Sequence, residues 1–476
     1  GPGRDARSGR PATSAAAFPG GAARWWLWHS LATLADDLAR RGSRLAVARG
    51  RPAATVAALA VAARATAVVW TAGRAPAERD DDGRLAAALR AAGVAPVVVP
   101  GCDLLHDPAR LLTAEGRPYR VFTPFWRRLA AEAAAAAGGT PAGDPLPAPR
   151  RLPPAPPPLP GETTLAALRP AAVRPWAAGF AAWRPGERHA AAALAAFVAG
   201  PLDDYARLRD RPDRDGTSRL SPHLHWGEVS ARQVWAAVAG ALAERGLAPD
   251  LSPGPPATAA PSGFAASAGA FLRQLAWREF AHHLLHHHPA TLDEPLDGRF
   301  RAFPWRDDPA ALAAWQRGET GYPFVDAAMR CLWATGWLHN RARLVVASFL
   351  VKDLLLPWQA GAAWFLDTLV DADAANNALG WQWVAGCGAD AAPYFRVFNP
   401  VAQGLRHDPD GAFVARWLPV LRGLPPRWRH EPWRAPAAAL AAAGVRLGAT
   451  YPFPLVKHGE ARAPALAAWA AVRRRG

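Results

Sequence analysis

The sequence has 476 residues, of which 51% are apolar and 20% charged, and this composition excludes an intrinsically disordered chain. At roughly 150 residues per domain, the chain is long enough for two or three domains with a sizeable core. Its 55 basic and 39 acidic residues give a net charge of +16, which suggests a polyanionic partner such as nucleic acid. The base composition of the source genome explains this surplus of basic residues equally well. Lysine occurs only at Lys352 and Lys457, so nearly all the positive charge comes from Arg.

Cysteine usage and hydropathy restrict the compartment. Cys102, Cys331 and Cys387 are too few and too widely spaced for a disulfide framework or a CxxC metal site, so we expect a reducing, cytoplasmic compartment. No stretch of about 18 apolar residues is free of charges and helix breakers, so no membrane span is expected. Residues 1–24 lack the apolar core of a secretory signal, and we expect a disordered or non-native start there.

Between residues 25 and 130, helical and strand patterns alternate. Helices are expected at 31–40, 55–63 and 84–92, and strands at 43–48, 67–70 and 95–99. Such alternation predicts an α/β domain in which helices cover a parallel sheet. Residues 131–186 include the proline-rich run 141–160 and are expected to form an extended linker. From 187 to 476 the apolar spacing predicts an all-α domain, with helices at 187–200, 228–245, 268–288, 323–335 and 337–355.

A turn rich in hydroxyl groups precedes one of these helices. It consists of Thr217, Ser218, Arg219, Leu220 and Ser221. Hydroxyl groups, backbone amides and a guanidinium at such a turn suit a pyrophosphate. Simple helix capping by Ser and Thr explains the same residues.

A second group lies on the helix predicted at 268–288. Phe271, Gln274, Trp277, Arg278 and Ala281 recur at i,i+3 and i,i+4 spacings and therefore share a face. An apolar plate beside an amide and a guanidinium suits a planar base extruded from a duplex. A core tryptophan with an arginine extending past it explains the spacing too, and spacing alone favours that interpretation.

A third group is Asp371, Asp373, Asn377 and Trp381, of which the last three are four residues apart along one side of a helix. Carboxylates are favoured at a helix N-terminus and can accept hydrogen bonds from an imide N–H or ribose hydroxyls of a cofactor. Trp381 can supply an electron to a nearby redox ring, although core packing of Trp381 and Trp383 is an alternative.

Five histidines cluster near the end of the same predicted helix that carries Trp277, at positions 282, 283, 286, 287 and 288. Some are four residues apart, but no further ligand stands at a familiar spacing, so no metal site is expected. A solvated helix end is the favoured interpretation.

Four segments strongly resemble the photolyase and cryptochrome family, and within it the bacterial cyclobutane pyrimidine dimer photolyases. They are residues 216–235 (GTSRLSPHLHWGEVSARQVW), 271–280 (FLRQLAWREF), 321–355 (GYPFVDAAMRCLWATGWLHNRARLVVASFLVKDLL) and 371–404 (DADAANNALGWQWVAGCGADAAPYFRVFNPVAQG). The resemblance implies an α/β, Rossmann-like antenna-type domain followed by a larger all-α FAD-binding domain. The first strand of the α/β domain is expected to be missing, because nothing before Trp25 resembles the family's opening segment.

By this resemblance, FAD contacts its phosphates through Tyr205 and the turn 217–221, and its ring and sugar through Arg343, Asp371, Ala372, Asp373 and Asn377. The lesion cavity would include Trp277 as a stacking plate. The other residues implied at the DNA are Gln274, Asn340, Arg341 and Gln403 in the cavity, with Arg209 and Arg278 nearer the backbone. Trp381, Trp358 and Trp305 match the family's chain of electron-carrying tryptophans.

The implied activity is light-dependent repair of cyclobutane pyrimidine dimers, by electron transfer from excited, reduced FAD to a flipped-out lesion, with Asn377 and Trp277 as catalytic residues. Asn377 would face flavin N5 and cannot readily deliver a proton, which favours repair over signalling. His339-Asn340 replaces the histidine pair of (6-4) photolyases, where acid–base chemistry needs a second imidazole. The alternatives are a cryptochrome-type blue-light photoreceptor and a DNA-binding flavoprotein without repair activity.

The resemblance also implies a monomer that binds damaged DNA, is cytoplasmic, and associates with the nucleoid when bound. A second, light-harvesting chromophore (methenyltetrahydrofolate, a deazaflavin or another) stays open, because Trp70 to Pro76 (WTAGRAP) departs from the family's antenna pattern. Gln274 stands where many relatives have Glu, which affects rate and affinity rather than role.

Overall fold

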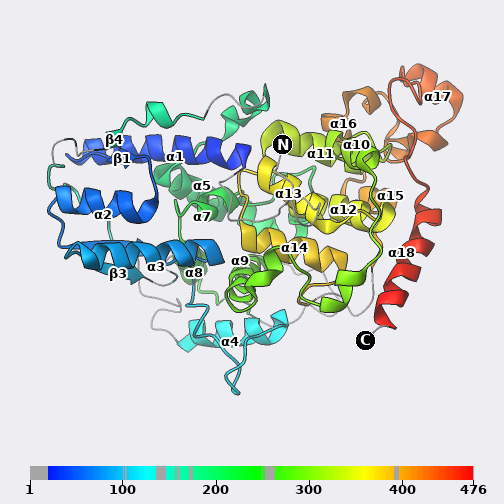
Figure 1. Ribbon diagram of the computed structural model, residues 1–476. Coiled ribbons are helices and arrows are strands. Elements are labelled where there is room, and N and C mark those ends of the chain that lie inside the picture. Colours follow the sequence, from blue (N-terminus) through cyan, green and yellow to red (C-terminus); the bar gives the residue numbers. More distant parts are fainter. Residues whose placement is uncertain are drawn as a thin grey trace.

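The computed structural model describes residues 20–99, 101, 104–135, 146–155, 158, 161–170, 175–248, 250–251, 263–390 and 396–474. Helices dominate, and the short strands lie at one end of the molecule beside α1, α2 and α3 (Figure 1). These three helices span Gly21–Arg40, Pro52–Ala62 and Pro76–Ala91. The expected α/β region followed by a larger helical region is confirmed.

The N-terminal part contains two small sheets among the described residues. Strands β2 (Ala67–Thr71) and β3 (Ala95–Val99) are parallel, with Ala67 opposite Ala95, as the alternating pattern predicts. Strand β1 (Val47–Ala48) is shorter than the predicted strand, and it pairs antiparallel with β4 (Glu162–Thr163). The segment expected to be a purely extended linker therefore supplies a strand. Much of the proline-rich run and residues 1–19 lie outside the described residues.

The rest of the described chain is helical, as predicted. The helices are α4 (Phe122–Ala135), α5 (Glu187–Ala199), α6 (Tyr205–Leu208), α7 (Ser221–His225), α8 (Ala231–Ala243), α9 (Phe264–His287), α10 (Pro309–Arg317), α11 (Pro323–Thr335), α12 (Asn340–Ser348), α13 (Trp358–Thr368), α14 (Ala374–Ala385), α15 (Pro400–His407), α16 (Ala412–Trp417), α17 (Ala437–Ala442) and α18 (His458–Arg473). The helix predicted at 337–355 ends earlier, because a π-helical turn, Phe349–Asp353, follows α12.

Helix α9 lies at the centre of the molecule, where it packs against α4, α8 and α14 (Figure 1). Fifteen of its 24 residues are buried, on all sides of the helix, which explains why no single apolar stripe is visible in its sequence. Because α9 borders both the N-terminal part and α14, its side chains can connect these two regions.

The prediction of a solvated helix end is wrong for His282 and His283, whereas His286, His287 and His288 are half-buried. His282 and His283 are 4% and 0% exposed, respectively. His283 Nε2 accepts a hydrogen bond from the backbone N–H of Tyr119 at 3.0 Å, and His287 Nε2 lies 2.9 Å from the Pro108 carbonyl oxygen. The run therefore packs against the segment before α4. No group of residues suited to a metal ion occurs among the described residues.

Cys331 and Cys387 are free and buried, whereas Cys102 lies outside the described residues. No helix in the described part of the chain is long and apolar enough to cross a membrane. In the π-helical turn, Lys352 is 1% exposed and its Nζ donates to the Ala385 carbonyl oxygen at 3.3 Å. Burial holds the pKa of Lys352 well below its usual range.

Candidate active site

A cavity of about 350 Å³ opens between α9, α12, α13 and α14, a volume typical of small-molecule sites. Its wall combines apolar rings with hydroxyl groups, amides, guanidinium groups and carboxylates. The sequence-predicted residues that line it are Tyr205, Ser218, Ser221, Gln274, Arg278, Asn340, Arg343, Asp371, Ala372, Asp373, Asn377 and Trp381. The structure thus brings together residues from all three sequence groups.

Arg343 and Asp371 form an ion pair at this wall. Arg343 Nη2 lies 3.0 and 2.8 Å from the two carboxylate oxygens of Asp371, and its Nε donates to the Leu338 carbonyl oxygen at 2.8 Å. The Asp371 side chain is 3% exposed and that of Arg343 25%, so the carboxylate is buried while the guanidinium is partly open to the solvent. The pair fixes the guanidinium so that its remaining N–H groups can meet a polar edge of a bound ring.

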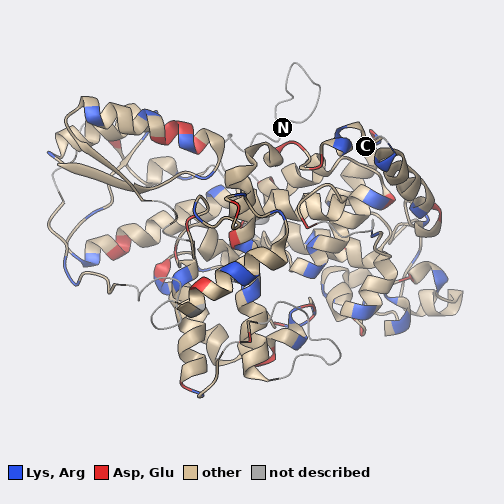
Figure 2. Ribbon diagram, turned by 90° about the horizontal axis from the view of Figure 1, so that it is seen from below, with Lys and Arg blue, Asp and Glu red and all other residues tan. Residues whose placement is uncertain are grey.

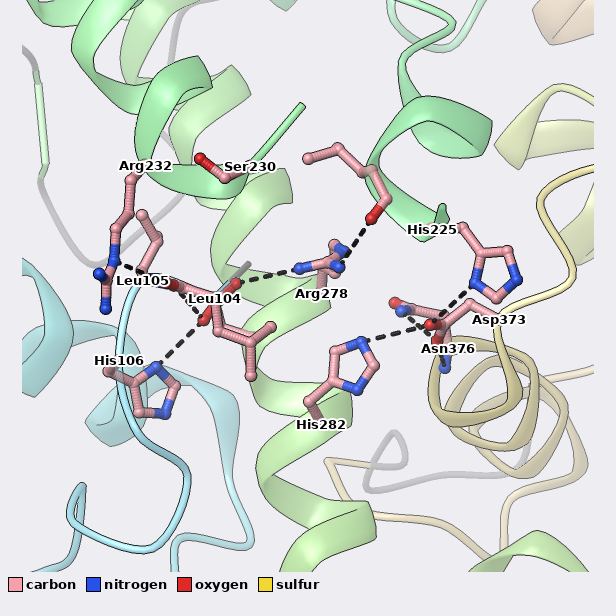
Figure 3. A network of polar contacts seen from close by, with 12 residues as sticks. Leu104, Leu105, His106, His225, Ser230, Arg232, Arg278, His282, Asp373 and Asn376 are labelled. Carbon is pink, nitrogen blue, oxygen red and sulfur yellow. Dashed lines mark hydrogen bonds and ion pairs between the residues drawn. The ribbon is translucent and has the colours of Figure 1, made fainter. Parts of the chain in front are cut away.

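Asp373 caps α14 and is the centre of a polar network (Figure 3). Its Oδ1 accepts hydrogen bonds from the backbone and side-chain nitrogens of Asn376 at 2.8 and 2.7 Å. Its Oδ2 lies 3.3 Å from His282 Nε2 and 3.6 Å from His225 Nδ1. Burial acts to raise the pKa of Asp373, but the two imidazoles outweigh it and hold the pKa well below its usual range.

Asn377 lies one helical turn after Asp373 and faces the same cavity. Its Nδ2 donates to the Ala362 carbonyl oxygen of α13 at 3.1 Å. This bond fixes the orientation of the amide and leaves no acidic proton on this part of the wall.

Trp381 continues the same side of α14. Its side chain is 2% exposed, lines the cavity and makes edge contacts with Phe365 and Trp315, with ring centroids 5.1 and 6.2 Å apart. A Cβ on Gly361 would lie 2.1 Å from its Cη2, so the ring approaches the backbone of α13 where glycine leaves room. The Trp381 Nε1–H has no acceptor among the described residues.

The other two tryptophans of the expected chain belong to the same core. Trp358 begins α13 and is 1% exposed, whereas Trp305 is half-buried and packs against Phe303, with ring centroids 4.2 Å apart and planes tilted by 38°. Trp381 and Trp358 are therefore both buried, and Trp305 is the most exposed of the three.

Only part of the hydroxyl-rich turn 217–221 lines the cavity. Ser218 and Ser221 line the cavity, and Trp337 Nε1 donates to Ser221 Oγ at 3.2 Å. Thr217, Arg219 and Leu220 are absent from the described cavity wall. Arg219 pairs with Asp215 at 2.6 Å and lies over the Trp337 ring, while Leu220 is 1% exposed.

The helix face that carries Trp277 is also divided. Phe271, Gln274 and Arg278 line the cavity, whereas Trp277 is absent from its described wall. The Trp277 ring stacks on Phe122 of α4, with centroids 3.7 Å apart and planes at 8°. The expectation that Trp277 shares the cavity face with Gln274 is therefore wrong for this arrangement, and its role as a stacking plate stays a prediction.

Arg278 is buried in the cavity wall rather than exposed on the surface. Its side chain is 10% exposed, its Nη2 donates to the Leu224 carbonyl oxygen at 3.1 Å, and its Nη1 lies 3.4 Å from Glu279 Oε1 (Figure 3). The family resemblance implies a position near the DNA backbone, but the structure places Arg278 inside the wall.

The remaining predicted DNA contacts are accessible. Asn340 is exposed, and Arg209, Arg341 and Gln403 are half-buried. Arg341 Nη2 lies 2.9 Å from Asp210 Oδ2, which orients its guanidinium. Basic residues occur on elements across the whole view of Figure 2. In contrast to these accessible residues, His339 is buried. Burial lowers its pKa to about 4 and keeps this imidazole neutral.

Sequence reasoning missed several residues of the wall. His225, Asn376 and Trp337 line the cavity, and His282 holds Asp373 from behind. His282 stands in the histidine run, but its spacing gives no sign that it faces a carboxylate on another helix. That contact depends on the crossing of α9 and α14.

Comparisons with known proteins show the family to which the chain belongs. Residues 5–150 match the family described as DNA photolyase, and residues 271–471 match the FAD binding domain of DNA photolyase. A deoxyribodipyrimidine photo-lyase of Agrobacterium fabrum is 44% identical over 96% of this chain and 90% of its own length. The chain belongs to the photolyase and cryptochrome family.

Relatives in this family include both enzymes and receptors. Cryptochrome-1 of Arabidopsis thaliana is 36% identical over 94% of this chain and 63% of its own length. Among solved structures, a bacterial class III photolyase from Agrobacterium tumefaciens superimposes with a TM-score of 0.86, covering 96% of this chain and 90% of that one.

The cavity wall fits the FAD of the matched domain. Hydroxyl and guanidinium groups suit its phosphates, while the carboxylates and amides on α14 suit the polar edge of a flavin and its sugar. The apolar side chains, among them Leu344, Ala347 and Phe365, suit the faces of a flat ring.

Proposed function

We propose that this protein repairs cyclobutane pyrimidine dimers in DNA in a light-dependent reaction. When bound in the cavity, reduced FAD supplies one electron to the lesion after absorbing light. The observation that carries the proposal is the α14 wall, where Asn377, fixed by the Ala362 carbonyl, stands one turn from Trp381. An oriented amide and a buried indole suit a site that moves electrons without supplying protons.

The side chains of this chain hold the reactants and exclude proton chemistry. Arg343 and Asp371 orient the polar edge of the ring, and Asp373 accepts hydrogen bonds at the start of α14. Gln274 and Asn340 offer amides that can both donate and accept hydrogen bonds toward a flipped-out pyrimidine pair. Their position at the cavity holds the lesion close to the electron donor.

Asn340 at the cavity and its neighbour His339 favour one type of DNA lesion over another. Repair of a (6-4) product needs a proton donor, whereas cleavage of a cyclobutane ring after electron transfer does not. Asn340 offers an amide at the cavity, and neighbouring His339 is buried and neutral. These two residues favour the cyclobutane dimer.

We infer that DNA binds through its phosphates to Arg209 and Arg341, with Gln403 nearby, and that the protein acts as a monomer. Affinity is then salt-dependent and independent of sequence. Tryptophans 381, 358 and 305 are proposed to carry electrons from the surface to the flavin.

The decisive experiment is repair of an ultraviolet-irradiated oligothymidine by purified protein with reduced FAD. Blue light is expected to restore the ultraviolet absorbance lost on dimer formation, while a dark control stays unchanged. An oligonucleotide with a (6-4) product is the matched substrate and should stay unrepaired. Absence of repair under blue light would instead favour a photoreceptor or a repair-inactive flavoprotein.

A further inference from the structure

The segment Trp70 to Pro76, which departs from the family's antenna pattern, carries one side chain that extends from the N-terminal part toward the cavity proposed to hold FAD. Arg74, in the loop between β2 and α3, extends toward α9. Its Nη1 lies 3.4 Å from His282 Nε2, the imidazole nitrogen that also lies 3.3 Å from the Asp373 carboxylate. A basic side chain of the N-terminal part is therefore one residue removed from the wall on which FAD is proposed to bind.

Two carboxylates of α3 fix the backbone of this loop. Asp82 Oδ2 accepts a hydrogen bond from the Gly73 N–H at 2.6 Å, and Glu78 Oε2 accepts from the N–H groups of Arg74 and Ala75 at 2.8 and 3.0 Å. A Cβ on Gly73 would lie 2.5 Å from the Glu78 Cβ, so glycine permits this close approach. The Arg74 side chain thus starts from a backbone held in place before any ligand binds.

Charges of both signs surround Arg74. Burial lowers the pKa of Arg74, and the neighbouring guanidinium of Arg278 lowers it further, while Asp373 and Glu279 act in the opposite direction. Glu279 is itself tied to the N-terminal part, because its Oε2 accepts from the Leu105 N–H at 2.8 Å. Arg278, Asp373 and Glu279 therefore all act electrostatically on Arg74 from the other side of the α9 contact.

His282 is the connection between Arg74 and the cavity. Burial lowers its pKa, and Asp373 opposes the effect. Its Nδ1 has no partner among the described residues, so the polar contacts of this ring are all made at Nε2. We assign the Nε2 proton to the bond with Asp373, because a carboxylate is the stronger acceptor, and Arg74 then acts on the pair through its charge.

We propose that Arg74 is a positioning residue for the flavin, which acts through His282 to hold the Asp373 carboxylate at the cavity wall. The proposal rests on the placement of FAD in this cavity proposed above. Its consequence is that the N-terminal part adjusts the electrostatics of the flavin site even when it holds no second chromophore. A cation at this place favours the reduced, anionic flavin over the neutral oxidised ring.

The test replaces Arg74 in the full-length protein and measures FAD affinity and the flavin midpoint potential. Arg74→Gln should weaken FAD binding about tenfold, which corresponds to about 1.4 kcal/mol, and shift the potential to a more negative value. Arg74→Lys, which retains the charge, should restore most of the potential. Arg90→Gln removes the same charge from an exposed position on α3 and should change neither quantity.

Coupling through His282 is tested by combining variants. In a His282→Gln background, Arg74→Gln should have little further effect on FAD affinity or potential, because the connection is already lost. Full additivity of the two variants would overturn the proposal. So would an Arg74→Gln protein with wild-type affinity and potential.

The two proposals fail in different ways. If Asp373→Asn and Arg343→Gln leave FAD binding unchanged, FAD does not occupy this cavity, and the proposed site itself is wrong. If they weaken FAD binding while Arg74→Gln does not, the site holds and the positioning role of Arg74 is wrong. Thermal unfolding of each variant, measured without FAD, separates a loss of affinity from a loss of fold.

Discussion

The side-chain amide of Asn377 donates from Nδ2 to the backbone carbonyl oxygen of Ala362 at 3.1 Å, which ties α14 to α13 beside the cavity. An aspartate in its place could make this bond only when protonated, because an ionised carboxylate would face the carbonyl oxygen. Asn377→Asp should therefore place a proton source at the flavin. We expect the flavin after photoreduction to be protonated in the variant and anionic in the parent, as measured by visible absorption spectroscopy.

One result would contradict this role of Asn377. If Asn377→Asp binds FAD normally and its photoreduction spectrum equals that of the parent, the side chain at 377 does not control the protonation of the flavin. FAD content, measured after denaturation, is the control for binding.

Close packing between Gly361 and Trp381 leads to a second prediction. A methyl group at position 361 would lie 2.1 Å from the Trp381 ring, so Gly361→Ala must displace the indole. We expect a loss of about 1–3 kcal/mol in the free energy of unfolding, as for other overpacked cores, together with slower photoreduction of FAD. Gly240→Ala in α8 is the matched control, because its Cβ meets nothing within 4 Å. Urea unfolding and photoreduction kinetics check both.

Trp277 and Phe122 allow packing to be separated from DNA recognition. Their stacked rings should show a coupling of about 0.5–1.5 kcal/mol in a double-mutant cycle of Trp277→Ala and Phe122→Ala, measured by urea unfolding. If Trp277 also stacks on a flipped-out lesion, Trp277→Ala weakens binding to dimer-containing DNA. Phe122→Leu, which keeps an apolar neighbour, should then bind that DNA normally. Equal losses in both variants would show that Trp277 acts through packing.

His283 makes stability depend on pH. Burial lowers its pKa to about 3 from the ordinary value of 6.5, and its Nε2 accepts from the Tyr119 N–H. Protonation thus favours the unfolded chain, so the contribution of the neutral ring is complete above about pH 6.5 and is lost as the pH falls toward about 3. His283→Gln keeps an acceptor for Tyr119 without titrating. It should reduce the slope of unfolding free energy against pH by about 1.4 kcal/mol per unit in this window.

Urea unfolding at several pH values measures this slope. A variant with the same slope as the parent would contradict the assignment, because another group would then bind the protons.

The sequence predicts the helices of the larger region and the parallel pairing of β2 with β3, because apolar spacing reports which face of an element is buried. It does not predict β4, since a two-residue strand just after a proline-rich run has no periodicity of its own. The break after α12 is also invisible, because the apolar spacing continues through the π-helical turn.

The candidate site follows the same division. Spacing along one helix places Asp373, Asn377 and Trp381 on one side of α14, and all three line the cavity. Spacing fails for Trp277, whose direction is decided by a ring on α4. Spacing also fails for His282 and Arg74, because their partners come from other elements. Contacts between elements far apart in the chain produce no periodic pattern in the sequence of either element.

The two lysines of the chain occupy opposite environments. Lys352 is enclosed beside the Ala385 carbonyl, whereas the Lys457 side chain is 80% exposed next to Glu460. Among the described residues, Lys457 at the start of α18 is therefore the one lysine side chain that an amine-reactive reagent can reach. A fluorophore or surface anchor attached there would sit at a defined point, which suits single-molecule measurements on illuminated DNA.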